Sequence, residues 1–234
     1  MLRIIAGLFL FLIIHLALAE SAMITLSVKQ QKIEVPFWAS KKTGNGMVIV
    51  VGDNEGSLLL HPLSEQIAAF GWSVVLLKSE KDLPWLEQLP EALSALRQKN
   101  NKRMVVIHYG DQLKELLDYF AKPQSKQVNA LILLSSYDLP AMPAKVDKAE
   151  EKSKSPLKFR FAVLDIAGQF DYPAVLEQYT LRKTRFAPDN YRQLTVPGAT
   201  HDYSYQQGLL ASFINGKMSK LIVPKLSRPP IPIR

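Results

Sequence analysis

The sequence contains 234 residues, no cysteine and a formal net charge of +8 at pH 7. Without cysteine the chain cannot form disulfides, so its stability must come from a hydrophobic core. Hydrophobic residues make up 47% of the chain, and its length suits one α/β domain with a substantial core. The basic balance favours anionic partners, such as lipid head groups or polyanionic envelope polymers. Nucleic acid is not an expected partner, because the chain has no cluster of arginine and aromatic residues.

The first nineteen residues are typical of a secretory signal peptide. Arg3 is their lone charge, an apolar run covers residues 4–18, and Ala17-Leu-Ala19 provides a small-x-small cleavage site. The run is about fifteen residues long, which is short for a membrane span of about twenty. We therefore expect cleavage after Ala19 and an exported, periplasmic protein without a transmembrane span; a retained anchor is the alternative. Cleavage leaves 28 basic and 21 acidic residues, a net charge of +7.

Hydrophobic patterning predicts alternating strands and helices in the rest of the chain. Residues 24–39 alternate apolar and polar side chains around Gln30-Gln31, which favours an antiparallel hairpin. Later apolar runs are continuous, as in strands buried on both faces, and they alternate with segments of helical spacing. This order indicates a mostly parallel sheet between two layers of helices, with the hairpin at its edge. Strands are expected at 47–51, 72–78, 104–108, 128–134, 158–164 and 191–196, and helices at 58–70, 89–99, 111–120, 173–185 and 203–214.

Two segments differ from the expected domain, which covers residues 20–216. Residues 139–158 combine prolines with mixed charge and offer no apolar face, so they predict a solvated loop in place of a cap. A lid that contacts substrate is the alternative. Residues 217–234 contain five basic residues, no acidic ones and four prolines, which excludes a long helix. We expect an extended strap on the domain, with a polyproline II docking segment as the alternative.

The segment 104–117 carries the most informative motif. It predicts a strand, a sharp turn at Gly110 and a helix, the layout in which α/β-hydrolases carry the nucleophile at the centre of Gly-x-Ser-x-Gly. Glycine accepts the positive φ that such a turn requires, but it has no hydroxyl. The flanking residues, His108 and Gln112, are larger than the small residues of that pattern. The motif therefore predicts the turn of a hydrolase without its nucleophile.

Asp111 is a second candidate for the nucleophile position. Some relatives of this fold use an aspartate nucleophile, but with Asp111 at the centre the flanking residues, Tyr109 and Leu113, are larger still. Asp111 also precedes an apolar helical segment, where a carboxylate accepts hydrogen bonds from free backbone N–H groups. We expect Asp111 to be the N-cap of that helix.

An acid and a base follow in the order that α/β-hydrolases use for their triad. Asp171 follows an apolar run and His201 lies in Pro197-Gly-Ala-Thr-His201. We expect the two side chains to touch, with the carboxylate fixing the imidazole tautomer and the imidazole acting as a base. Asp171 as the N-cap of the helix after it is the alternative, and Asp202 is a candidate cap for the last helix.

The loop after the first parallel strand, residues 52–56, is expected where hydrolases build the oxyanion hole. Its two carboxylates, Asp53 and Glu55, would oppose the development of negative charge there. The mature chain has three histidines, His61, His108 and His201, and they lack the spacing of metal ligands. Neither a metal nor a cofactor is expected.

The chain resembles the DUF3530 family, bacterial exported proteins of unknown function described as α/β-hydrolase-like. The similar pieces are Val50-Val-Gly-Asp53 with Pro62-Leu63 downstream, Phe70-Gly-Trp72, residues 103–110, residues 168–171 and His201. The resemblance implies an α/β-hydrolase-like three-layer sandwich. The family often has glycine at the centre of the elbow, in a Gly-His-Gly setting, and the first position of this chain's turn departs from that pattern.

The sequence therefore predicts an exported α/β-hydrolase-fold protein with a degenerate nucleophile elbow. We expect it to bind a ligand or partner of the cell envelope without catalysis, in a cleft at the carboxyl ends of its strands. The residues expected to line that cleft are Gly52, Asp53, Tyr109, Gly110 and His201. The alternative is an active ester or amide hydrolase that uses Asp111 or a water activated by Asp171 and His201.

Overall fold

The computed structural model describes residues 21–40, 44–52, 57–79, 82–99, 103–122, 128–139 and 159–221. The expected signal peptide lies outside these ranges, as do Asp53, Glu55, nearly all of the charged segment 139–158 and most of the basic tail. Within the described ranges, no helix is long and apolar enough to cross a membrane.

One eight-stranded sheet forms the centre of the protein, in the order β1-β2-β4-β3-β5-β6-β7-β8. The strands from β3 to β8 run parallel, whereas β1 and β2 are antiparallel and close one edge. This arrangement confirms the predicted parallel sheet with an amino-terminal hairpin. The strands are β1 (Ser21–Val28), β2 (Gln31–Trp38), β3 (Gly46–Gly52), β4 (Trp72–Lys78), β5 (Arg103–Tyr109), β6 (Ala130–Leu134), β7 (Ala162–Phe170) and β8 (Tyr191–Thr200).

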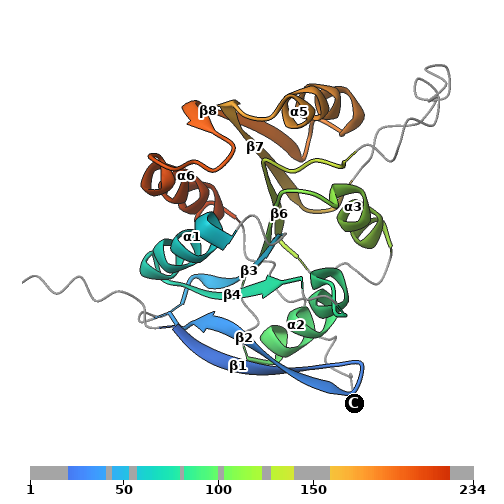
Figure 1. Ribbon diagram of the computed structural model, residues 1–234, viewed down its shortest axis with the longest axis vertical. Coiled ribbons are helices and arrows are strands. Elements are labelled where there is room, and N and C mark those ends of the chain that lie inside the picture. Colours follow the sequence, from blue (N-terminus) through green and yellow to red (C-terminus); the bar gives the residue numbers. More distant parts are fainter. Residues whose placement is uncertain are drawn as a thin grey trace, which may run out of the picture.

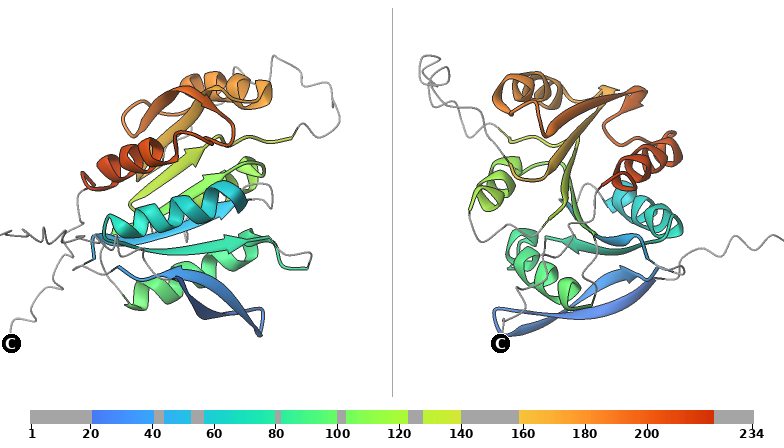
Figure 2. Two further views of the ribbon diagram at one scale, coloured as in Figure 1. Left: turned by 60° about the vertical axis from the view of Figure 1, so that its left-hand side comes forward. Right: turned by 180° about the vertical axis from the view of Figure 1, so that it is seen from behind.

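Helices cover both faces of the sheet, so the molecule has three layers. Figure 1 shows α1 and α6 on one face and α2, α3 and α5 on the other, and the rear view in Figure 2 shows the same division. Two large hydrophobic clusters fill the spaces between these layers, and the central strands contribute to both. The helices are α1 (Ser57–Ala69), α2 (Trp85–Lys99), α3 (Leu113–Ala121), α5 (Pro173–Arg185) and α6 (Gln207–Met218).

Two helices begin elsewhere than their patterns predict. The expected helix at 89–99 begins one turn earlier, at Trp85, so Pro90 lies inside α2 and not in its first turn. Trp85 and Leu89 are fully buried, and their burial offsets the cost of an interior proline. The expected helix at 111–120 begins at Leu113, because Gln112 has a left-handed backbone with φ 73°.

The last two elements are also displaced from the expected ranges. β8 continues beyond residue 196 to Thr200, and α6 begins at Gln207 and not at 203. Tyr203 has a φ of 52°, which a right-handed helix cannot contain, so residues 201–206 form turns before the helix begins. Residues 217 and 218, which were expected to open the tail, form the end of α6.

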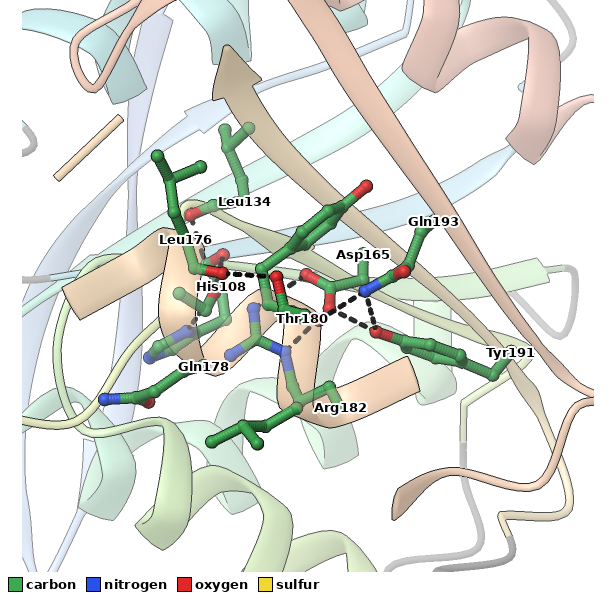
Figure 3. A network of polar contacts seen from close by, with 12 residues as sticks. His108, Leu134, Asp165, Leu176, Gln178, Thr180, Arg182, Tyr191 and Gln193 are labelled. Atoms are coloured by element: carbon green, nitrogen blue, oxygen red, sulfur yellow. Dashed lines mark hydrogen bonds and ion pairs between the residues drawn. The ribbon is translucent and has the colours of Figure 1, made fainter. Parts of the chain in front are cut away.

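A buried polar network joins α5 to β7 and β8 (Figure 3). The guanidinium of Arg182 donates two hydrogen bonds to the carboxylate of Asp165, at 2.7 and 3.0 Å. The Tyr191 hydroxyl donates to the same carboxylate at 2.5 Å, and Gln193 donates to that hydroxyl at 2.9 Å. The strand expected at 158–164 is displaced, because β7 begins at Ala162 and continues through the polar Asp165 to Phe170.

The same network positions the amino end of α5. Arg182 lies near the end of this helix and is buried, and the helix begins at Pro173, two residues after Asp171. A two-pronged ion pair has a defined geometry, so it fixes both the rotation and the position of the helix on the sheet. The position of the candidate acid, Asp171, thus depends on the ion pair of Arg182, which lies eleven residues later in the sequence.

Replacement of Arg182 by methionine should lower the free energy of unfolding by about 3–5 kcal/mol, because it leaves the Asp165 carboxylate buried without its counter-ion. Urea unfolding followed by circular dichroism would measure the loss. The double variant Asp165→Asn/Arg182→Met should be more stable than Arg182→Met alone, since it removes the unpaired charge. Equal stability of Arg182→Met and the wild type would contradict this account.

Candidate functional site

The predicted site residues meet at one edge of the sheet, where the parallel strands end; we call it the carboxyl edge. Gly52 and Tyr109 are the last residues of β3 and β5 and lie opposite each other in the sheet. Gly110 follows β5 directly, Asp171 follows β7, and His201 follows β8. Four segments that are far apart in the sequence therefore converge, as the parallel topology predicts.

His201 and Asp171 form a buried pair. Their contact joins Nδ1 of the imidazole to Oδ1 of the carboxylate at 2.6 Å, which confirms the predicted contact. The other carboxylate oxygen accepts a hydrogen bond from the backbone N–H of Gly168 at 3.0 Å and one from the hydroxyl of Ser135. Burial alone would raise the pKa of Asp171, but the hydrogen bonds from His201, Ser135 and Gly168 outweigh it and hold the pKa below its ordinary value.

This geometry determines the tautomer of a neutral His201. The ionised Asp171 carboxylate can only accept hydrogen bonds, so Nδ1 carries the proton and Nε2 presents a lone pair. Within the described residues, Nε2 makes no hydrogen bond to another side chain. In a neutral imidazole held in this way, Nε2 is the hydrogen-bond acceptor.

Ser135 is a site residue that the sequence analysis missed. It follows β6 with a positive φ of 45°, an unusual value for a residue with a side chain. Since its single proton goes to Asp171, the Tyr203 hydroxyl, 2.8 Å away, must donate to the Ser135 oxygen. Burial raises the pKa of Tyr203, so its hydroxyl stays protonated and can fill that role. The signal available in the sequence was a polar pair, Ser135-Ser136, directly after a buried strand.

Three tyrosines surround the imidazole of His201. The Tyr172 ring stacks on it with centroids 4.0 Å apart, and the rings of Tyr109 and Tyr137 lie at 5.0 and 6.0 Å. Tyr109 also donates a hydrogen bond to the backbone carbonyl of His201 at 3.4 Å. Tyr109 and Tyr137 are buried, whereas Tyr172 is 48% exposed. The site therefore has one accessible aromatic wall, and the sequence analysis had named only Tyr109 among the three.

Gly110 forms the expected turn. Its φ of 84° lies in the region that favours glycine, and its carbonyl accepts a hydrogen bond from the Tyr137 N–H at 2.9 Å. Leu113 returns a hydrogen bond to the Tyr137 carbonyl at 3.2 Å. These two hydrogen bonds connect the turn at Gly110 to the segment that follows the neighbouring strand, β6. No side chain stands at the position that the nucleophile occupies in Gly-x-Ser-x-Gly, because that residue is a glycine.

The expected N-cap role of Asp111 is wrong. Gln112 is the N-cap residue of α3, and no side chain of its own caps the helix. Oδ1 of Asp111 instead accepts hydrogen bonds from the backbone N–H groups of Gln112 and Leu139, at 2.7 and 2.8 Å. Asp138, from the segment after β6, accepts a hydrogen bond from the Lys114 N–H at 2.6 Å and thereby caps the amino end of α3. A cap supplied by a distant segment leaves no local sequence pattern.

Two further capping alternatives are also wrong. Tyr172 occupies the N-cap of α5 with Pro173 after it, and no side chain caps that helix end. Asp171 is directed to His201 instead. Asp202 accepts hydrogen bonds from Thr200 and Ser204, in the turns that precede α6.

His108 stabilises the turn from the opposite face of the sheet to Tyr109. Its Nδ1 lies 2.8 Å from the Ser136 hydroxyl and its Nε2 lies 3.0 Å from the Asp111 carbonyl. Burial, aided by the charge of Arg182 and only partly opposed by the hydrogen bond to Asp111, lowers the pKa of His108 to about 3. The ring is therefore neutral at pH 7, with Nε2–H donating to the carbonyl and Nδ1 accepting from Ser136. The large side chain of His108 is accommodated beside the turn because it forms a hydrogen bond with the turn's backbone.

The histidines do not assemble a metal site in the part of the chain that the structure describes. Within it, no group of three or more histidine, aspartate or glutamate side chains could hold a metal ion. His108 and His201 bind different partners, Ser136 and Asp171 respectively.

Comparison with solved structures identifies the fold. Est1E from Butyrivibrio proteoclasticus is 14% identical over 85% of this chain and 98% of its own, with a TM-score of 0.65. An α/β serine hydrolase homologue from Coxiella burnetii is 12% identical over 85% and 96%, with a TM-score of 0.60. An α/β serine hydrolase without a lid from Xanthomonas campestris is 13% identical over 88% and 97%, with a TM-score of 0.59.

These likenesses confirm the predicted α/β-hydrolase fold, and at such low identity they show the fold alone. No profile of a known protein family matches the sequence, and no curated protein matches it. The resemblance to DUF3530 and the roles of the site residues therefore stay predictions.

The low pKa of His108 should make the protein less stable as the pH falls from about 6 to 4. In this window the unfolded chain, with a histidine pKa near 6.5, binds a proton that the folded protein does not bind, so stability decreases by roughly 1 kcal/mol per pH unit. Urea unfolding at several pH values should show a flatter dependence for His108→Gln. The exposed His61 provides the matched control, and an equal flattening in His61→Gln would contradict the assignment.

Proposed function

We propose that this protein is an exported α/β-hydrolase-fold protein that binds a small ligand at Gly110 and His201 without cleaving it. The observation that supports this function is a complete acid and base beside an absent nucleophile. His201 and Asp171 are 2.6 Å apart, whereas the residue at the centre of the elbow has no side chain atom that could attack a substrate.

The chemistry of the site favours a neutral ligand that donates a hydrogen bond. A neutral His201 offers the Nε2 lone pair, which binds a hydroxyl or N–H group. The half-exposed ring of Tyr172 beside it offers a flat surface to an apolar or aromatic part of the ligand. Glycine at position 110 has no side chain to occupy the place where a nucleophile would stand.

Export is supported by the amino-terminal sequence. The lone Arg3, the apolar run and the Ala17-Leu-Ala19 site are typical of a signal peptide, and the chain has no cysteine that could attach a lipid. The resemblance to the exported DUF3530 proteins agrees with a periplasmic location. We therefore place the ligand or partner in the cell envelope.

An ester or amide hydrolase that uses activated water is the second candidate. The short hydrogen bond between Asp171 and His201 favours it, because it would stabilise an imidazolium formed when His201 takes a proton from water. The version with an aspartate nucleophile has less support. Oδ1 of Asp111 already accepts two backbone hydrogen bonds, which an attack on a substrate would weaken.

Hydrolysis of p-nitrophenyl butyrate separates these candidates. The wild type and His201→Ala should release p-nitrophenol at the same rate, since neither has a nucleophile. Gly110→Ser should also stay at that rate, because His108, Asp111 and Tyr137 still hold the turn in its present form. A wild-type rate that falls about a hundredfold in His201→Ala would establish the activated-water hydrolase instead. Loss of such activity in Asp111→Asn would point to the aspartate.

Phenol is a suitable probe of ligand binding, because it combines a hydroxyl donor with a flat ring. It should shift the imidazole NMR signals of His201, assigned by comparison with His201→Gln, and leave those of His61 unchanged. Anisole, which has the ring but no donor, should bind at least about tenfold more weakly, the cost of an unmade hydrogen bond to a buried acceptor. Gly110→Asn should block the shift, since asparagine tolerates positive φ and fills the space. Equal binding of phenol and anisole would contradict the proposed role of Nε2.

A further inference from the structure

The edge of the sheet opposite the candidate site is strongly basic; we call it the amino edge, where the parallel strands begin and the helices end. Several exposed cations lie there. Some are in or just after the last turn of a helix, and the others are at or just before the start of a strand. In the part of the chain that the structure describes, two exposed carboxylates accompany them, Asp189 and the Asp118 of the last turn of α3, which is paired with Lys114. The cations are Arg97, Lys122, Arg160, Lys183, Arg185, Arg192, Lys217 and Lys220.

Helix dipoles explain only part of this charge. A cation in the last turn of a helix stabilises its negative end, which accounts for side chains such as Lys183 and Lys217. Arg160 and Arg192 belong to strand entries and not to helix ends. Arg192 is held in place by hydrogen bonds from its guanidinium to the carbonyls of Pro188 and Tyr191, at 2.5 and 2.9 Å. The edge therefore carries more positive charge than the helices require.

An apolar cavity opens on the same edge. It lies between β6, β7 and the end of α6, and its volume of about 180 Å³ is several times the 30 Å³ share of one water molecule in the liquid. Ala130, Ile132 and Leu164 line it on the sheet side, and Met218 and Leu221 line it on the helix side. Such a lining suits a hydrocarbon chain better than a polar group.

Two of the cations, Arg192 and Lys217, also line this cavity, together with the carboxylate of Asp189, so its charged lining keeps a net positive charge. An apolar space with cations beside it matches one class of ligand, a hydrocarbon chain attached to an anionic head group. A polyanionic polymer would pair with the cations but would leave the apolar lining unused. Charge and shape together thus favour an anionic lipid over a polymer.

The chain also enters and leaves the described domain at the amino edge. Ser21 pairs with Trp38, which pairs with Val74 near the start of β4. At the other end, Leu221 lines the cavity. Both ends of the described part of the chain therefore lie at the amino edge.

We propose that the amino edge binds the surface of a bilayer containing anionic phospholipid, with the acyl chain of one lipid entering the cavity beside Arg192 and Lys217. This orientation places His201 and Gly110 on the side away from the membrane. The interaction is independent of ligand binding at the carboxyl edge, because the two sites lie at opposite ends of the parallel strands.

Vesicle flotation with the expected mature chain, residues 20–234, tests the electrostatic part. The protein should float with vesicles of phosphatidylglycerol and phosphatidylcholine, and less with phosphatidylcholine alone. Each cation near an anionic surface contributes about fivefold in affinity, so Arg192→Gln/Lys217→Gln should bind the anionic vesicles about 25-fold more weakly. Lys32→Gln/Lys114→Gln is the matched control with the same net charge, since both lysines are exposed away from the amino edge, and it should bind like the wild type.

A second pair of variants tests the cavity. Ala162 lines it and is exposed, so Ala162→Phe should fill the space without removing a core side chain, whereas Ala162→Ser should leave it open. Exclusion of even two methylenes of an acyl chain should weaken vesicle binding by about tenfold in Ala162→Phe alone. Equal losses in the two charge variants, equal flotation with neutral vesicles, or binding to polyphosphate without binding to vesicles would overturn the proposal. Unchanged binding of Ala162→Phe would overturn the entry of an acyl chain.

Discussion

The buried carboxylate of Asp171 is the constraint on which the arrangement of the carboxyl edge depends. An ionised carboxylate can be buried only if its oxygens accept hydrogen bonds. Here the donors are Ser135 after β6, Gly168 in β7, Tyr172 at the start of α5 and His201 after β8. These four donors come from consecutive stretches of the parallel sheet, so satisfying one charge fixes the relative positions of three strand ends and a helix. The orientation of the imidazole then follows from that of the carboxylate.

The turn at Gly110 differs from that of a hydrolase in more than one missing hydroxyl. His108 donates to the Asp111 carbonyl, Asp111 accepts from Leu139, and Tyr137 pairs with Gly110 itself. Each of these contacts uses a residue that is larger or more polar than the motif requires, and together they stabilise the turn from both sides.

The sequence predicted the order of elements, the parallel sheet and the meeting of Asp171 with His201, because these follow from local hydrophobic patterns and from where strands end. The prediction failed where the role of a residue depends on a partner far away in the sequence. Asp165 lay beyond the predicted end of β7, because the local sequence does not show that Arg182, 17 residues away, is its counter-ion. The left-handed backbones of Gln112 and Tyr203, which displace two helix starts, likewise carry no local signature. Ser135 could have been found, since polar residues directly after buried strands reach the carboxyl edge of such a sheet.

The parallel fold itself separates charge between the two edges of the sheet, where the two proposed binding sites lie. Because each helix runs antiparallel to the strands, helix starts lie at the carboxyl edge and helix ends at the amino edge, where acidic and basic residues respectively complement the dipoles. Among the described residues, the carboxyl edge carries the carboxylates of Asp111, Glu115, Asp138 and Asp202 beside the ammonium groups of Lys78 and Lys114, although of these carboxylates only Glu115 lies in the first turn of a helix. An anionic ligand would be repelled there and attracted to the opposite edge, whereas a neutral hydrogen-bond donor would not be repelled at either. Each proposed ligand is therefore compatible with the charge of the edge at which it is proposed to bind.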